Sequence, residues 1–143
     1  MPEVNRSVLV DYTPEQMFAL VDAVERYPEF LPWCGGASVS HRDDARTRAT
    51  IEISYRGIKQ RFTTENAKRP PTEMDICLVE GPFRELDGHW RFTALGEHSC
   101  KVEFRLRYEF SSRLLATLLG PVFDFIANSF VEAFVKRANR LYG

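Results

Sequence analysis

The C-terminal stretch from Ser111 to Gly143 decides the fold, and it reads SSRLLATLLGPVFDFIANSFVEAFVKRANRLYG. The two serines at its start are a helix N-cap signal. Further on, polar residues recur at every fourth position, which on an α-helix places them in one narrow stripe facing solvent. These residues are Asp124, Asn128, Glu132, Lys136 and Arg140. The rest of this helix is apolar, so it requires a wide apolar surface on which to pack.

The first part of this helix, from Leu114 to Leu119, is apolar on every side, and Gly120 and Pro121 follow it. Proline lacks the N–H group that would continue the helical hydrogen bonds, so a kink or break is expected there. The pattern therefore divides the stretch into a structural helix from Val122 onward and a leucine-rich segment before it. That segment is a candidate for a pocket mouth, a membrane contact or a partner surface.

Length and composition indicate one domain over residues 1–143, of an ordinary globular type. The net charge of −1 gives no support to binding DNA by overall charge. Cys34, Cys77 and Cys100 are widely spaced, which argues against a zinc site or a redox dithiol and suits a reducing compartment. No uninterrupted apolar run approaches the ~18 residues of a membrane span. The expected location is the cytoplasm, with the surface of the inner membrane as the alternative.

The N-terminal part predicts one strand followed by short helical segments. Val4–Val10 has the pattern of a strand. Thr13 as N-cap, Pro14 at the first helical position and Gln16 at the third predict a helix that ends near Arg26, before Pro28. The run from Tyr27 to Cys34, YPEFLPWC, predicts a short, rigid turn with large apolar side chains.

The middle of the chain alternates between apolar and polar residues. The clearest case is the stretch from Val102 to Phe110, with apolar residues at every second position. About six consecutive strands joined by short turns predict an antiparallel meander. A curved sheet of about seven strands around the long C-terminal helix, with short helices after the first strand, is the α+β arrangement known as the helix grip.

The inner face of such a sheet is rich in aromatic and aliphatic residues, which suits a cavity for a hydrophobic ligand. A solidly packed core has the same pattern, so periodicity alone leaves both alternatives open. The candidate lining residues are Trp33, Ile53, Tyr55, Phe62, Met74, Ile76, Leu78, Phe83, Trp90, Phe92, Phe104, Leu106, Tyr108, Leu118, Val122, Phe123 and Ile126. Candidates for the cavity mouth or a partner contact are Phe30, Leu31, Leu114, Leu115 and Leu119.

The sequence predicts no catalytic residues and no metal site. His41, His89 and His98 lie in unrelated strands and turns, and no known hydrolase, metalloprotease or nucleotide-binding motif occurs. Catalysis inside the fold would need an acid or base that points inward, and only His41 and Arg6 qualify by their strand parity. The protein is therefore expected not to be an enzyme and to need no cofactor.

Basic residues form two groups, one on the outer face of the sheet and one at the end of the long helix. They are candidates for contact with ribosomal RNA, namely Arg91, Lys101, Arg105, Arg107, Lys136, Arg137 and Arg140. Cross-strand ion pairs would explain the first group without a partner, and the helix dipole would explain the second.

Several stretches together resemble one family. They are Tyr12–Met17, Tyr27–Cys34, Gly81–Phe83, Gly88–Phe92 and Ala133–Ala138. They are similar to the START-like bacterial family that includes the ribosome association toxin, which is related to the coenzyme-Q-binding proteins and is often labelled polyketide cyclase/dehydrase or lipid transport. The resemblance covers nearly the whole chain. Asp11 departs from it, because family members often carry proline there.

The resemblance implies a helix-grip fold with an apolar tunnel, and it adds three functional expectations. The first is non-enzymatic binding of ubiquinone or a related isoprenoid lipid in support of respiration. The second is binding of the large ribosomal subunit, which blocks subunit association. A polyketide cyclase or aromatase activity is the third. A peripheral contact with a membrane is a further expectation.

Overall fold

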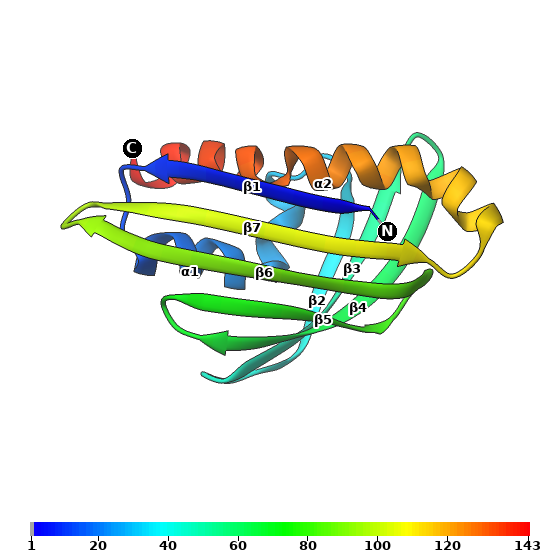
Figure 1. Ribbon diagram of the computed structural model, residues 1–143, viewed down its shortest axis with the longest axis horizontal. Helices are drawn as coiled ribbons and strands as arrows, with labels where there is room; N and C mark the ends of the chain where they lie inside the picture. Colours follow the sequence, from blue (N-terminus) through cyan, green and yellow to red (C-terminus); the bar gives the residue numbers. More distant parts are fainter. Residues whose placement is uncertain (1) are drawn as a thin grey trace.

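The computed structural model describes residues 2–143 and contains one seven-stranded antiparallel sheet on which a long helix packs (Figure 1). The strands are β1 (Glu3–Val10), β2 (Cys34–Arg42), β3 (Arg46–Tyr55), β4 (Ile58–Arg69), β5 (Glu73–Glu80), β6 (Phe83–Gly96) and β7 (Ser99–Phe110). The helices are α1 (Pro14–Asp22), the 3-10 helix η1 (Val24–Glu29) and α2 (Arg113–Tyr142). This is the predicted α+β helix grip.

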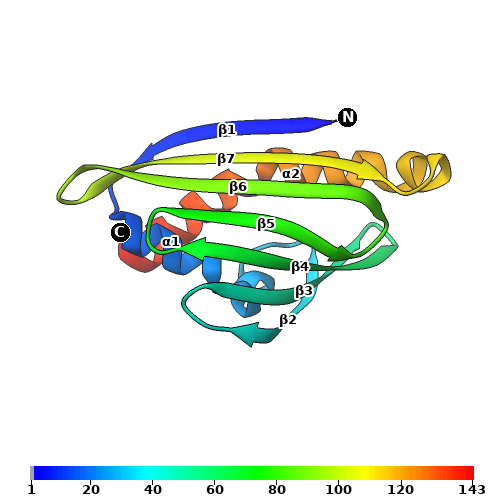
Figure 2. The ribbon, with the colours of Figure 1, turned by 60° about the horizontal axis from the view of Figure 1, so that its bottom comes forward.

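The sheet runs in the order β1-β7-β6-β5-β4-β3-β2, so the predicted meander is confirmed from β2 to β7. The first strand pairs with the last, with Val8 opposite Val102. The first and last strands in the sequence are therefore neighbours in the sheet. Figure 2 shows the strands curving around α2. The concave face carries the aromatic residues, and the convex face carries most of the charged ones.

Two hairpin turns explain where the strands reverse. Arg56 and Gly57 connect β3 to β4 with φ angles of 49° and 80°, a left-handed pair that suits a two-residue turn. Gly81 connects β5 to β6 with φ of 154°, and a Cβ atom there would lie 2.6 Å from Cβ of Phe62. Glycine is therefore required at position 81 by both backbone conformation and space.

The first helix begins as predicted but ends earlier. Thr13 and Gln16 form the predicted capping box. The prediction that this helix ends near Arg26 is wrong, because α1 ends at Asp22 and η1 continues the chain past Pro28. The last carbonyl groups of α1 have partners elsewhere in the fold. The hydroxyl of Tyr27 donates to the carbonyl of Val21, and Arg42 Nη2 donates to that of Asp22 at 2.8 Å.

The long helix α2 has the predicted polar stripe but no break. The five residues of the stripe are all exposed, and the opposite face is buried through Phe123, Ile126, Phe134 and Ala138. The prediction that the helix is divided into two segments at Gly120 and Pro121 is wrong, since α2 is one helix from Arg113 to Tyr142. Buried Leu119 and Phe123 hold it to the sheet on both sides of the proline.

The helix α2 is also long and apolar enough to cross a membrane by length and composition alone. The core helix of a globular fold passes the same test. Here α2 packs its buried face on the sheet, while Leu114, Leu118 and Phe125 remain at least half exposed. These three residues fall on one side of the helix and form an exposed apolar stripe.

Candidate functional site

A cavity of about 70 Å³ lies between the concave face of the sheet and α2. Its wall is almost entirely apolar, and every major element except β1 and β2 contributes to it. A water molecule needs roughly 10–15 Å³ of such space, so the cavity has room for several small groups. It is smaller than the pockets of about 300–1,000 Å³ that hold drug-sized ligands. The interior is thus neither a solid core nor an open tunnel.

Part of the predicted lining surrounds this cavity. The residues that do so are Trp33, Phe62, Met74, Ile76, Trp90, Phe104, Leu106, Phe123 and Ile126. They come from β4, β5, β6, β7, α2 and the turn before β2. Both tryptophans are nearly inaccessible to solvent, with exposed fractions of 3% for Trp33 and 1% for Trp90. The two indole rings therefore report directly on the cavity.

Other predicted lining residues lie elsewhere. Phe92 and Tyr108 are buried in the solid part of the core, Tyr55 lies on a surface groove, and Leu78 is half-buried away from the cavity. A second, nearly filled void contains Ile53, Phe83 and Val122. Leu118 is 55% exposed, so its assignment to the lining is wrong. The cause is the rotation of α2, which turns Leu119 and Phe123 toward the sheet and Leu118 away from it.

The residues predicted at the cavity mouth fall into two separate places. Leu31 is fully buried, and Phe30 packs edge-on against Phe134 with ring centroids 5.2 Å apart. The leucines lie near the other end of α2, where Leu119 is buried, Leu115 is half-buried and Leu114 is 68% exposed. These five residues therefore do not form one mouth.

Sequence reasoning missed the polar part of the cavity wall. Thr64 and Asn66 line the cavity from β4, and their exposed fractions are only 5% each. The signal was available, because Phe62, Thr64, Asn66 and Lys68 have the same parity on β4 and therefore face the same side. Polar residues on the inward side of a strand are unusual and mark a constrained position. The remaining missed lining residues are Val21, Val24, Tyr27, Ile51, Leu86, Ala127 and Phe130.

A groove of about 670 Å³ lies on the surface beside the cavity. It runs between the turn at Pro28–Trp33 and the second half of α2. Trp33 lines both the groove and the cavity. Tyr55 and Phe125 stack at the groove with ring centroids 5.4 Å apart, and the cations at its α2 side are Lys136, Arg137 and Arg140.

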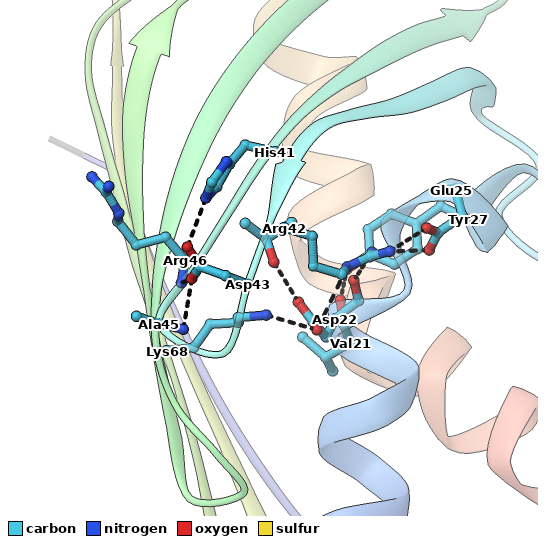
Figure 3. Close-up of polar contacts among 11 residues, drawn as sticks. Val21, Asp22, Glu25, Tyr27, His41, Arg42, Asp43, Ala45, Arg46 and Lys68 are labelled. Atoms are coloured by element: carbon cyan, nitrogen blue, oxygen red, sulfur yellow. Dashed lines mark hydrogen bonds and ion pairs between the residues drawn. The ribbon is translucent and has the colours of Figure 1, made fainter.

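A polar cluster joins the end of α1 to the sheet (Figure 3). Asp22 accepts hydrogen bonds from Thr47 Oγ1 at 2.9 Å and from Lys68 Nζ at 3.0 Å. The side chain of Lys68 is only 3% exposed, so Asp22 neutralises a buried charge. Arg42 binds Glu25 through both Nη atoms at 2.6 and 3.0 Å, and this hydrogen bonding lowers the pKa of Glu25.

The ionisable side chains elsewhere have structural partners. His41, one of the two residues considered for a cyclase, is half-exposed, and its Nε2 atom lies 2.8 Å from Asp43 Oδ2. The hydrogen bond with His41 is the largest of the causes that lower the pKa of Asp43 to about 2. Arg6, the other, is exposed and donates to Asn128 on α2. Neither points into the cavity, contrary to what a cyclase would need.

The cysteines are not activated as nucleophiles. Burial raises the pKa of all three thiols, that of Cys100 to about 11. Burial likewise raises the pKa of Tyr27, whose hydroxyl stays protonated and donates to Val21. Among residues 2–143, no group of three or more His, Cys, Asp or Glu side chains could hold a metal ion.

Some of the basic residues predicted to contact ribosomal RNA form ion pairs within the protein, and others do not. Arg91 pairs with Glu73 and Lys101 with Glu103, and Arg107 lies 3.9 Å from Glu3. Arg137 binds Glu29 at 2.6 Å and lies over the ring of Phe30, so it is part of the packing. Within residues 2–143, Arg105, Lys136 and Arg140 form no ion pair. Arg105 lies on the convex face, and the other two lie on α2.

Sequence comparison relates most of the chain to one protein family and to several known proteins. Residues 10–135 match the family model described as polyketide cyclase / dehydrase and lipid transport. The chain is 45% identical to the ribosome association toxin RatA of Vibrio cholerae over 143 residues, covering all of this chain and 99% of that protein. It is 30% identical to a mitochondrial coenzyme Q-binding protein, COQ10 homolog B of Xenopus laevis, covering 99% of this chain and 59% of that protein.

Among solved structures, the Zhui aromatase/cyclase from Streptomyces superposes with a TM-score of 0.84. The superposition covers 97% of this chain and 94% of that chain, at 13% sequence identity. At that identity, the likeness concerns the fold alone.

Proposed function

Because this chain belongs to the polyketide cyclase/dehydrase and lipid transport family and matches a ribosome association toxin from end to end, we propose that it is a non-enzymatic regulator that binds the large ribosomal subunit and blocks subunit association. The observation that carries this proposal is the 45% identity over 143 residues. A relationship of that length includes the surface of the protein as well as its core.

The groove side of α2 is the surface that we assign to the ribosome. Lys136 and Arg140 are exposed there, one turn apart, and form no ion pair with any other residue from 2 to 143. The stacked rings of Tyr55 and Phe125 lie on the same groove, and Phe125 is 50% exposed. Cations together with exposed aromatic rings are the combination by which proteins bind unpaired RNA.

Reversing the charges of Lys136 and Arg140 should weaken binding to purified large subunits. For the double variant Lys136→Glu/Arg140→Glu we expect roughly tenfold or greater loss of affinity at physiological salt, because contacts with phosphate release counterions. The slope of log affinity against log salt should become shallower by about 2. Cosedimentation with large subunits over a range of salt concentrations measures both quantities.

The matched control is Arg61→Glu/Arg105→Glu, which makes the same change of charge on the convex face. Both arginines are exposed and form no ion pair within the described chain. The control should bind large subunits nearly as well as the unmodified protein. Equal losses in the two double variants would show that net charge alone matters and would refute the assignment to α2.

A second function, binding of an apolar small molecule, is favoured by the cavity. Its wall is mostly apolar, and Trp33 borders both the cavity and the groove. At about 70 Å³ it is too small for a whole isoprenoid lipid. A ring would enter it by displacing side chains, and an attached tail would lie in the groove. Binding of duroquinone, a benzoquinone with four methyl groups, tests this candidate through quenching of Trp33 and Trp90 fluorescence.

The cavity wall supports binding better than catalysis. The ionisable side chain among its residues is Tyr27, whose hydroxyl is bonded to a backbone carbonyl. A general acid or base must reach the reacting atom. The assignment as a non-enzymatic protein rests on this arrangement, and the likeness to an aromatase/cyclase concerns the fold.

A further inference from the structure

Asn66 is the one amide side chain in the wall of the cavity, and it is 95% buried, with an exposed fraction of 5%. Its Oδ1 atom accepts a hydrogen bond from Thr64 Oγ1 at 3.1 Å. Its Nδ2 atom donates to no other residue in the range 2–143. Two N–H donors on Nδ2 thus border a cavity whose other polar side-chain groups are the hydroxyls of Thr64 and Tyr27 and the indole N–H groups of Trp33 and Trp90.

Nδ2 keeps some accessible surface, because within residues 2–143 the side-chain nitrogen or oxygen that is fully buried without a partner is Arg137 Nε. A donor that borders a largely apolar space is normally paired with protein, water or a ligand. A water molecule is held well when it has two to four polar partners. The hydroxyls of Thr64 and Tyr27 donate to Asn66 and Val21, so toward the cavity they can act only as acceptors. A ligand atom that accepts a hydrogen bond would take the place of such a water at Asn66 Nδ2.

The charges nearby indicate that the ligand is neutral. Lys68 has the same parity as Asn66 on β4, but its ammonium group is bound by Asp22 at 3.0 Å. No unneutralised charge therefore acts on the cavity from β4. An ion would lose its hydration on entry without gaining a counter-charge.

We propose that Asn66 and Thr64 form the polar end of a ligand site, in which Asn66 Nδ2 donates a hydrogen bond to a carbonyl oxygen of an uncharged, otherwise apolar ring. This inference rests on the second function proposed above. Thr64 has a positioning role, since its hydroxyl turns Oδ1 of Asn66 toward itself and leaves Nδ2 for the ligand. The aromatic side chains of Trp33, Trp90 and Phe104 form the wall beside the ring.

The test compares two probes of nearly the same shape, duroquinone and durene, which is the benzene with four methyl groups and no carbonyl. Duroquinone binding is followed by quenching of Trp33 and Trp90, and durene binding by competition. We expect the unmodified protein to bind duroquinone about tenfold or more tightly than durene, since a buried donor is left unpaired by durene. In Asn66→Leu this preference should disappear, while durene binds at least as tightly.

Two further variants keep the test decisive. Thr64→Val retains the shape of the side chain and should reduce the preference without abolishing binding. Asn5→Leu makes the same change at an exposed position on β1 and should leave both affinities unchanged. Asn66→Leu also removes the acceptor of the Thr64 hydroxyl, so the melting temperature of the ligand-free variant should fall modestly, and both affinities are measured at a temperature at which the variant is folded.

Each remaining outcome is informative. A preference for duroquinone that survives in Asn66→Leu would overturn the inference. Equal affinities of the unmodified protein for the two probes would overturn it as well, because they would mean that water satisfies Asn66. Binding of neither probe would overturn both the inference and the second function. Ribosome binding would be unaffected by that result.

Discussion

Replacing Asp22 by alanine is expected to lower the free energy of unfolding by about 3–5 kcal/mol, because it leaves a buried ammonium group without its partner. Lys68 Nζ lies 3.0 Å from Asp22 Oδ2, and its side chain is 3% exposed. The hydroxyl of fully buried Thr47 would lose its acceptor as well. Urea denaturation of Asp22→Ala measures the loss.

The control for this prediction removes both charges. In Asp22→Leu/Lys68→Met the apolar side chains need no counter-charge, and replacing a buried pair in this way is often neutral. This double variant should therefore be more stable than Asp22→Ala. If Asp22→Ala alone unfolds at the urea concentration of the unmodified protein, the ion pair contributes nothing to stability and the role assigned to the cluster in Figure 3 is wrong.

The second large effect concerns the aromatic core. Trp90→Ala should lower the free energy of unfolding by about 3–5 kcal/mol, the range for removing a buried tryptophan. The indole is 1% exposed, and its ring centroid lies 4.4 Å from that of Phe104 and 5.5 Å from that of Phe134. Because Phe134 belongs to α2, the loss also loosens the helix from the sheet. Thermal and urea unfolding both measure it.

Leu114→Ala is the matched control for an apolar side chain outside the core. Leu114 is 68% exposed on the first turn of α2. Surface substitutions of this kind change stability by about 0.5 kcal/mol or less. A cost for Leu114→Ala close to that of Trp90→Ala would show that the first turns of α2 are covered in solution.

The architecture could be predicted because its signals are local. Strict alternation from Val102 to Phe110 identified β7, and the four-residue repeat from Asp124 identified the exposed face of α2. The turns follow from Gly57 and Gly81, which tolerate positive φ, whereas the positive φ of Arg56 does not follow from its residue type. The resemblance to a known family agreed with this reading along nearly the whole chain.

The interior could not be predicted to the same extent. A strand's inward face looks the same whether it encloses a cavity or a solid core, so Phe92 and Trp90 could not be separated. The early end of α1 is accompanied by hydrogen bonds to its last carbonyl groups from the side chains of Tyr27 and Arg42, and the alternation of residues does not reveal these contacts. The rotation of α2 about its own axis, which exposes Leu118 and buries Leu119, depends on how the helix packs on the sheet.

The central claim is that this protein blocks the association of ribosomal subunits, and subunit reassociation tests it most directly. Purified small and large subunits are separated at low magnesium, mixed with the protein and returned to high magnesium, and the particles are resolved on a sucrose gradient. A stoichiometric amount should reduce the peak of associated ribosomes, with the protein in the large-subunit fractions, and Lys136→Glu/Arg140→Glu should be less effective. An undiminished peak at a large excess of well-folded protein would contradict the account.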